Sequence, residues 1–357
     1  MKIGIYDPYL DDCGGGEKYM MTIASVLSGK HSVDVFWDDK DELKHVENRF
    51  GLDLSKIKLV KNIFTPKTST ISRMITSKKY DAIILLSDGS LPLLLCKKLF
   101  VHIQRPIEIK KFSLLEGIKK SRVTAFFCNS EFTKKFVDSQ FGIAAKVIYP
   151  PVELHPVKVK KENMILHVGR FRVYHKTNGT KDYKKQYVMV EAFKKMIDHG
   201  LKDWEFTIAV SVKEDDENAF ADLRRLATGY PIHFEVNKSN KELWEYYSKS
   251  KIYWHATGYG EDLMKYPEKA EHFGISTVEA MGAGAVPVVI DAGGQPEIIT
   301  DSENGMLWKS IPELIEETLI VIASEQLRNE LSKNAKTRAK DFTIQKFEEN
   351  VFDLMTV

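Results

Sequence analysis

Glu271 and Glu279, two carboxylates eight positions apart, are the residues of this sequence whose spacing points most directly to chemistry. We expect a helix to begin between them, near Gly274 or Ile275, so that Glu271 lies just ahead of its N-terminus and Glu279 lies within it. A carboxylate on the same side of such a helix can accept paired hydrogen bonds from a vicinal diol, which is the group that a ribose presents. This geometry suits a nucleotide.

The start of this expected helix supplies backbone donors. The first N–H groups of a helix have no internal partner and carry partial positive charge, so Phe273, Gly274 and Ile275 can donate to a diphosphate or to sugar hydroxyls. Gly274 allows a ligand to approach the backbone closely. We add Ser276 to these candidate donor-binding residues. Two glutamates at this spacing also occur by chance on surface helices, so the spacing alone does not decide.

A glycine run, Gly14-Gly15-Gly16, follows the first expected strand and opens a helix. Gly15 and Gly16 are candidates to let the backbone approach the donor phosphates or the acceptor. The run is not the GxGxxG fingerprint, because Tyr19 occupies the third glycine position, and no P-loop motif occurs in the sequence. Dehydrogenase and P-loop functions therefore lose support.

Size and composition predict two domains with a cleft between them, since 357 residues exceed what one core usually organises. Lys and Arg (52) nearly balance Asp and Glu (50), which argues against a nucleic-acid-binding protein. Three cysteines without metal-ligand spacing argue against structural zinc. With no signal peptide and no apolar run near the ~20 residues of a spanning helix, we expect a cytoplasmic protein.

Short apolar runs alternate with helical patterns, which is typical of βαβ units and parallel sheets. The runs interpreted as strands are 2–6, 32–37, 82–86, 99–103, 124–128, 164–168, 205–210, 232–236, 252–255 and 285–290, with helices at about 16–27 and 184–198. The prolines at Tyr149-Pro150-Pro151 place a linker near 150–163. Beyond Trp308 we expect helices, with Phe342, Phe347 and Phe352 on one buried stripe.

The stretch HFGISTVEAMGAGAVPVV, with PPVE at 150–153 and VGRF at 168–171, resembles the retaining GT-B glycosyltransferases of sequence family four, the glycosyl transferases group 1. The motifs GGGEKY near the start, CNSEFTKKF and AGGQPEII extend the likeness over essentially the whole chain. It implies an α/β fold with two Rossmann-like doubly wound domains facing a cleft. Their expected bounds are 1–153 (acceptor domain) and 154–335 (donor domain), and 336–357 is expected to cross back to the first domain as a helix.

The resemblance also assigns roles to the two glutamates. In such enzymes the first glutamate lies beside the transferred sugar and the second holds the nucleotide ribose, which corresponds to Glu271 and Glu279. His102, at the end of an expected strand, resembles the family histidine that faces the sugar from the N-terminal domain. A lone histidine at a strand end is otherwise more often structural.

Two cations complete the implied site. Arg170 in VGRF and a lysine further along match the residues that neutralise the donor diphosphate. Counting back from the motif EAF favours Lys184, but the inserted stretch 172–183 leaves Lys185 as an alternative. The alternative interpretation is that these two lysines are solvent-exposed and have no role in binding.

The implied reaction is transfer of a hexose with retention of configuration. We expect a same-face, dissociative transfer in which the diphosphate takes the acceptor proton, without an essential metal or a cofactor. The rival hypotheses are a GT-B sugar-nucleotide epimerase and a degenerate, non-catalytic nucleotide-sugar binding module. Every catalytic position that can be matched is occupied, which favours an active transferase.

The donor and the acceptor are less determined. The stretch GYGEDLMKYPEKAEHFGI resembles mannosyltransferase-like members and favours GDP-mannose over a UDP-hexose. Residues 56–80 carry seven Lys or Arg and no acidic residue, interleaved with apolar side chains. With Lys110-Lys111 and Lys119-Lys120 they would dock on anionic lipid and meet a glycan or lipid-linked acceptor, as a peripheral contact on the inner face of the membrane. Ordinary solvated loops explain the same pattern equally well.

Overall fold

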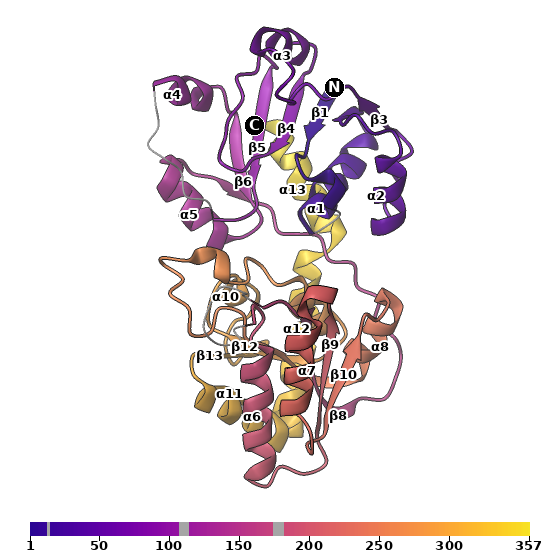
Figure 1. Ribbon diagram of the computed structural model, residues 1–357, viewed down its shortest axis with the longest axis vertical. Helices are drawn as coiled ribbons and strands as arrows, with labels where there is room; N and C mark the ends of the chain where they lie inside the picture. Colours follow the sequence, from indigo (N-terminus) through magenta and orange to yellow (C-terminus); the bar gives the residue numbers. More distant parts are fainter. Residues whose placement is uncertain (13–14, 107–113, 174–181) are drawn as a thin grey trace. The chain divides into compact units, whose positions relative to one another are not determined.

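The computed structural model describes residues 1–12, 15–106, 114–173 and 182–357 (Figure 1). The chain divides into two compact units. The N-terminal unit consists of Met1–Pro151 with Ile344–Val357, and the C-terminal unit of Val152–Thr343. The boundaries expected at 153 and 335 lie at 151 and 343 in this division, because the chain stays packed on the C-terminal unit through the end of helix α12 (Glu325–Ala339), where the Arg338 guanidinium donates to the Glu297 carbonyl at 2.7 Å.

The N-terminal unit is built on a seven-stranded parallel sheet with the order β3-β2-β1-β4-β5-β6-β7. Its strands are β1 (Lys2–Tyr6), β2 (Ser32–Phe36), β3 (Ile57–Val60), β4 (Ala82–Leu86), β5 (Lys98–Ile103), β6 (Ala125–Cys128) and β7 (Lys146–Val147). Strand β4 is buried along its whole length, as a central strand covered on both faces must be. Strands β3 and β7 were not expected from the sequence, because both are short edge strands with few buried apolar residues.

Helices cover this sheet in the doubly wound manner (Figure 1). They are α1 (Gly15–Ser28), α2 (Glu42–Phe50), α3 (Thr70–Ser77), α4 (Leu114–Ser121), α5 (Glu131–Phe141) and, from the end of the chain, α13 (Ile344–Thr356). Helix α13 buries Phe347, Val351, Leu354 and Met355 in the same core cluster as β1 and α1. The final helix therefore belongs to the N-terminal core, although it follows the other unit in sequence.

The prediction that three phenylalanines near the C-terminal end form one buried stripe is wrong. Phe342 lies in a short 3₁₀ helix of the C-terminal unit, where its ring packs edge-on against Phe273 at 5.3 Å. Phe347 and Phe352 lie in α13, and only Phe347 is fully buried. The spacing of five residues spanned a break between two helices, so a single helical period did not apply.

The C-terminal unit contains a six-stranded parallel sheet with the order β10-β9-β8-β11-β12-β13. Its strands are β8 (Glu162–Arg170), β9 (Glu205–Ser211), β10 (Ile232–Val236), β11 (Ser250–His255), β12 (Val286–Ile290) and β13 (Met306–Trp308). The helices around it are α6 (Gln186–Asp198), α7 (Glu217–Leu226), α8 (Asn240–Lys249), α9 (Ile275–Gly282), α10 (Gln295–Ile298), α11 (Ile311–Ala323) and α12. Two Rossmann-like parallel-sheet units confirm the predicted fold class.

The expected linker is fixed against the C-terminal unit. The Val157 N–H donates to the Ser248 hydroxyl at 2.8 Å, and a Cβ at Gly282 would overlap the Leu154 side chain. Lys161, just before β8, donates to the carbonyls of Ser250 at 2.7 Å and Ala283 at 3.0 Å. The Lys161 amino group thus donates to one carbonyl just after α8 and to another just after α9, so this segment is packed against the C-terminal unit.

Candidate functional site

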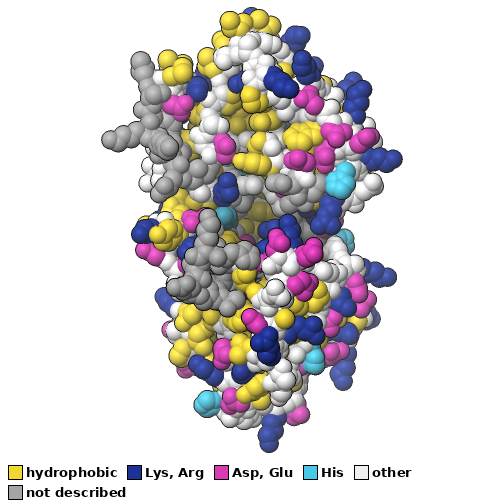
Figure 2. Space-filling model, in the orientation of Figure 1, with side chains coloured by type: hydrophobic (Ala, Val, Ile, Leu, Met, Phe, Trp, Pro, Cys, Tyr) yellow, Lys and Arg dark blue, Asp and Glu magenta, His cyan; other side chains and the backbone are white. Residues whose placement is uncertain are grey.

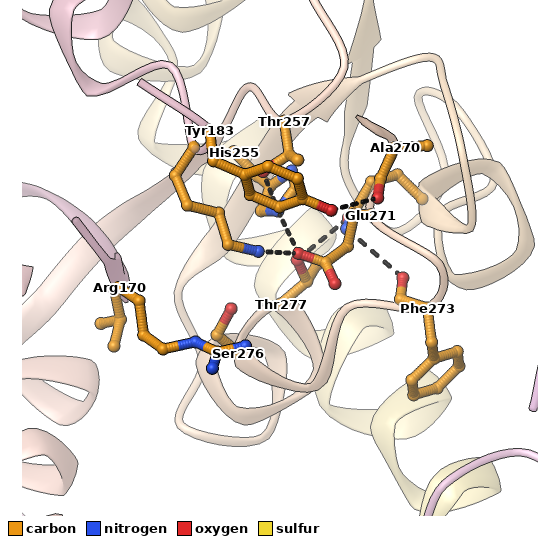
Figure 3. A network of polar contacts seen from close by, with 12 residues as sticks. Arg170, Tyr183, His255, Thr257, Ala270, Glu271, Phe273, Ser276 and Thr277 are labelled. Carbon is orange, nitrogen blue, oxygen red and sulfur yellow. Dashed lines mark hydrogen bonds and ion pairs between the residues drawn. The ribbon is translucent and has the colours of Figure 1, made fainter. Parts of the chain in front are cut away.

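Glu271 is the centre of a polar network in the C-terminal unit (Figure 3). It lies in the loop between β11 and α9, and its Oε2 atom accepts from two directions. Lys184, two residues before α6, forms an ion pair with this oxygen. His255, the last residue of β11, places Nε2 3.1 Å from the same oxygen. Two separate elements therefore fix one carboxylate oxygen.

The surroundings keep this carboxylate ionised. Burial raises the pKa of Glu271, but the charge of Lys184 and the hydrogen bond from His255 outweigh burial, and the pKa lies well below its usual range. Burial in turn lowers the pKa of His255, against a smaller opposing effect of Glu271. Both pKa shifts agree with a neutral His255 whose Nε2–H donates a hydrogen bond to an ionised Glu271.

A second buried histidine joins the strands beside the site. His167 lies in the neighbouring strand β8, and burial lowers its pKa to about 3. Its Nδ1 is 3.0 Å from the Trp254 carbonyl, so this nitrogen carries the proton and Nε2 is left as an acceptor. The Gln186 amide lies 3.4 Å from that Nε2. The start of α6 is thereby tied to the two strands that end at the site.

Helix α9 begins at Ile275, as expected from the sequence. Gly274 adopts φ +126°, a conformation that favours glycine, and a Cβ there would overlap the Gln295 side chain. Gln295 is fully buried; its oxygen accepts from the Thr277 hydroxyl at 2.9 Å and its amide donates to the Phe273 carbonyl at 3.4 Å. The turn that exposes the first N–H groups of α9 is therefore held by one glutamine.

The remaining predicted residues of α9 have partners of their own. Glu279 is half-buried, and its Oε2 accepts from the Tyr247 hydroxyl at 2.7 Å. Burial raises the pKa of Tyr247 well above its ordinary value, so that hydroxyl stays a donor. Ser276 lies one turn earlier and has its hydroxyl 2.7 Å from that of Tyr253. Tyr247 of α8 and Tyr253 of β11 thus orient the polar face of the helix.

The two consecutive lysines have different partners. Lys184 is paired with Glu271, whereas Lys185 is buried and places its Nζ 2.5 Å from Glu261 Oε1. Lys269 lies 2.8 Å from the other oxygen of Glu261. Of the two lysines that the sequence left as alternatives, only Lys184 is paired with the residue expected beside the sugar. Its contact with the diphosphate stays a prediction.

Arg170 ends strand β8 and is exposed. Within the described residues its side chain has no hydrogen bond or ion pair. Arg170 and Lys184 line one pocket of about 260 Å³, together with Arg172, Val173 and Tyr183. Two cations of adjoining elements therefore share a concave surface, as binding of an anion requires.

The other predicted residues belong to the N-terminal unit. Gly15 is the first residue of α1, and a Cβ at Gly16 would overlap the end of the Gln104 side chain, which would have to move; Gly14 lies outside the described residues. His102 in β5 is fully buried between the rings of Tyr19 and Phe127, with centroids 4.4 and 4.8 Å away. Its Nδ1 is 3.2 Å from the Phe127 carbonyl, and its Nε2 has no partner in the described part of the chain.

Several residues that organise the site were missed in the sequence. These are His255, Glu261, Gln295 and the pair Gly293-Gly294. The Gly294 N–H donates to the Glu271 carbonyl at 2.8 Å, and a Cβ at Gly293 would overlap that carbonyl. The glycine turn was noticed as part of AGGQPEII, but its contact with Glu271 joins segments more than twenty residues apart. No local signal marks His255 or Glu261, whose roles depend on tertiary contacts.

Comparison with known proteins gives the class. The model of the family Glycosyl transferases group 1 matches residues 155–338, more than half of the chain. The chain therefore belongs to this family, which confirms the predicted glycosyltransferase class. The described residues contain no group of three or more His, Cys, Asp or Glu side chains placed to hold a metal ion.

Individual relatives are more distant. The mouse GDP-Man:Man(3)GlcNAc(2)-PP-Dol alpha-1,2-mannosyltransferase is 24% identical over 261 residues, which cover 66% of this chain and 49% of the relative. The chain thus spans about half the length of the curated relatives it matches.

Solved structures agree in fold. Anabaena Alr3699/HepE, solved with UDP and glucose, aligns with a TM-score of 0.70 at 17% identity, over 100% of this chain and 99% of that one. WaaG, a glycosyltransferase involved in lipopolysaccharide biosynthesis, aligns with a TM-score of 0.60 at 14% identity over 100% of both chains. These likenesses establish the GT-B type of fold and not the substrate.

Proposed function

We propose that this protein transfers a hexose, with retention of configuration, from a nucleotide sugar to a glycan or lipid-linked acceptor. The observation that carries the proposal is the ionised Glu271, held by Lys184 and His255 just ahead of the N-terminus of α9. A fixed negative charge is suited to a sugar that develops positive charge as its bond to the diphosphate breaks. Family membership independently supports a transferase.

The cations and the helix start would hold the donor diphosphate. Arg170 is exposed and without a partner in the described residues, and Lys184 lines the same pocket. The first N–H groups of α9 add donors that carry no net charge. Together they would stabilise the diphosphate as it leaves, because negative charge then accumulates on its oxygens.

Glu279 would bind the ribose. Its Oε2 accepts from the Tyr247 hydroxyl, which orients the carboxylate. A vicinal diol needs two neighbouring acceptors, and an oriented carboxylate provides them. Replacement by alanine would remove those acceptors without cutting into the buried face of α9, because Glu279 is only half-buried.

The acceptor would attack from the face that the diphosphate leaves. In this same-face route the departing diphosphate takes the acceptor proton, so the protein needs no second carboxylate for a double displacement. His102 is assigned to the sugar on the resemblance of its surroundings. Its buried Nε2, which lacks a partner among the described residues, supports a role beyond packing. No essential metal is required in this scheme.

For the donor we favour GDP-mannose over a UDP-hexose. The name of the mouse relative specifies GDP-Man. HepE was solved with UDP and glucose, but its 17% identity bears only on the fold. The base therefore has to be identified by experiment.

The acceptor is proposed to be presented at an anionic membrane surface. No helix among the described residues is long and apolar enough to cross a membrane. Helix α3 exposes Ile71 and Ile75, one turn apart, at 70% and 60% of their surface. Figure 2 shows hydrophobic side chains with Lys and Arg beside them at the end of the N-terminal unit where Figure 1 places α3. The lysines at 67, 78 and 79 are exposed near this helix in sequence.

Several other residues of the expected lipid-binding surface are buried, already paired or outside the described residues. Ile57 and Ile63 are buried in the core, so they cannot contact lipid. Lys119 pairs with Glu116 at 3.0 Å, and Lys120 donates to the carbonyls of Phe141 and Gly142. Lys110 and Lys111 lie outside the described residues. The docking surface is therefore α3 with its flanking lysines.

One experiment tests the transfer and the donor. The purified protein is screened by thermal shift and by donor hydrolysis against UDP-, GDP- and ADP-sugars, with Glu279→Ala as the control. Stabilisation by one nucleotide series that is lost in Glu279→Ala supports the proposal and names the base. NMR of the product anomer then tests retention. No response to any nucleotide would favour a binding module without activity, and donor isomerisation without transfer would favour an epimerase.

A second experiment tests the membrane surface. Co-sedimentation with vesicles of phosphatidylcholine, with and without phosphatidylserine, compares the wild type with Ile71→Ser/Ile75→Ser. We expect binding that needs phosphatidylserine, weakens with salt and is lost in the variant. Equal binding of both proteins would refute the role of α3.

A further inference from the structure

Two consecutive lysines ahead of α6 pair with two glutamates of a single loop. Lys184 pairs with Glu271, and Lys185 pairs with Glu261 at 2.5 Å. The glutamates are ten residues apart in the connection between β11 and α9. Both ion pairs therefore join the same two segments of chain: the residues just before α6 and the loop between β11 and α9.

The pair formed by Lys185 is the more deeply buried one. Its side chains retain 9% and 8% of their exposure, against 16% and 22% for Lys184 and Glu271. Burial raises the pKa of Glu261, but Lys185 and Lys269 outweigh it and the pKa is lowered. With Lys269 at 2.8 Å, each oxygen of Glu261 has its own ammonium partner. A buried carboxylate satisfied in this way is costly to leave unpaired.

The backbone at this point is adapted to that arrangement. Lys185 has φ +61°, in the left-handed region that a lysine rarely adopts. The N–H of the next residue, Gln186, donates to the buried Asp182 carboxylate. In this backbone conformation Lys184 and Lys185 reach two different glutamates.

A third tie joins the same two segments. The Tyr183 hydroxyl donates to the Glu268 carbonyl at 2.8 Å and lies 3.2 Å from that of Ala270 (Figure 3). These carbonyls lie on either side of Lys269 and immediately before Glu271. The loop is thereby held at Glu261 by Lys185 and near its end by Tyr183, which restricts the position of Glu271.

We propose that Glu261 is a positioning residue: it holds Lys185 and Lys269 so that Lys184 alone faces Glu271 and the donor diphosphate. Glu261 does not itself touch the reacting atoms. The inference rests on the proposed function only for its kinetic consequence, because the pairing of the lysines can be measured without any substrate.

The first test measures lysine accessibility in the full chain. Reductive methylation with formaldehyde, read by mass spectrometry, compares the wild type, Glu261→Gln and Glu268→Gln. Glu268 is exposed and lies in the same loop, so its replacement removes the same charge without opening the buried pair. We expect Lys185 to be protected in the wild type and Glu268→Gln and to be modified at least tenfold faster in Glu261→Gln. Equal rates in all three proteins would overturn the proposal.

The second test measures turnover with the donor that the nucleotide screen identifies. We expect Glu261→Gln to lower kcat by about 10- to 100-fold, because small displacements of charged groups at a reacting centre have effects of this size. The dissociation constant of the nucleoside diphosphate should change by less, and Glu268→Gln should match the wild type. An unchanged kcat in Glu261→Gln would contradict the positioning role.

A double variant separates positioning from general damage. If Glu261 acts through Lys185, Glu261→Gln/Lys185→Gln should be no slower than Glu261→Gln alone, since both changes break one interaction. Strictly multiplicative losses would show that the two residues act independently and would refute the proposal. If the wild type turns over no donor at all, the proposed function fails, while the methylation result still decides whether Glu261 protects Lys185.

Discussion

His102 and His255 occupy corresponding places in the two units, and the difference between them is instructive. Each lies at or next to the end of a strand in the middle of a parallel sheet, and each is buried. Each also has one nitrogen satisfied and one without a partner in the described residues. They differ in the satisfied nitrogen: in His255 it contacts the carboxylate of Glu271, and in His102 it contacts a backbone carbonyl.

This difference decides how a role can be assigned. The contact of His255 with an ionised side chain links it to the site within one unit, so its effect on Glu271 follows from geometry. The contacts of His102 are two aromatic rings and a carbonyl, which a structural histidine would also make. Its proposed role depends on the partner that its Nε2 meets when the sugar is bound.

The largest expected effect concerns the carboxylate itself. Glu271→Gln keeps the shape of the side chain but removes the charge that would stabilise the sugar as its bond breaks. We expect kcat to fall by about 10²- to 10³-fold, with nucleoside diphosphate binding largely retained. Steady-state turnover and calorimetric titration measure the two quantities, with Glu268→Gln as the control for loss of a charge. Activity within a few-fold of the wild type would remove Glu271 from the mechanism.

The next effect tests whether His255 acts through Glu271. His255→Leu removes the hydrogen bond, and we expect kcat to fall by about tenfold or more. His255→Gln retains a donor and should recover part of that loss. Comparison of kcat and KM for the two variants at equal melting temperature provides the measurement. If the two variants are equally impaired, the hydrogen bond is not the reason for the loss.

A smaller effect is expected for His102. His102→Phe preserves the stacking between Tyr19 and Phe127 but removes the free Nε2. We expect kcat to fall by about tenfold, while the variant folds normally. Turnover and circular dichroism check the two parts. Full activity in a folded variant would place His102 with the structural residues and would make the two histidines unlike in function as well as in partners.

The smallest effect is a pH dependence of stability. Burial lowers the pKa of His102 to about 3, below its ordinary value of 6.5. Below pH 6.5 the unfolded chain therefore binds a proton that the folded chain excludes, so stability falls as the pH decreases toward 3. Between pH 7 and about 5.5 we expect this histidine to cost about 1 kcal/mol of unfolding free energy. Urea denaturation of the wild type and His102→Phe at both pH values should show a weaker pH dependence in the variant; identical dependences would contradict the assignment.

Much of the fold was readable because parallel strands buried on both faces are continuous apolar runs. Strands β1, β4 and β12 were located within one residue, and α9 begins where the glycine before it suggested. The edge strands β3 and β7 were not located, because short edge strands contain few buried apolar residues. The break before α13 was also missed, because the periodic spacing of one helix does not continue into the next.

The sequence by itself determined the residue types of the site and their local setting: a carboxylate ahead of a glycine-started helix, a second within it, and a strand-end arginine. Only the tertiary structure decided which of the two consecutive lysines pairs with Glu271, since Lys185 pairs instead with Glu261, which lies 76 residues away from it in the chain. It also supplied His255 and Gln295 as partners. The physical reason is that a hydrogen bond or ion pair depends on distances of a few ångströms in space, and spacing along the chain reports such distances only within a single helix or strand.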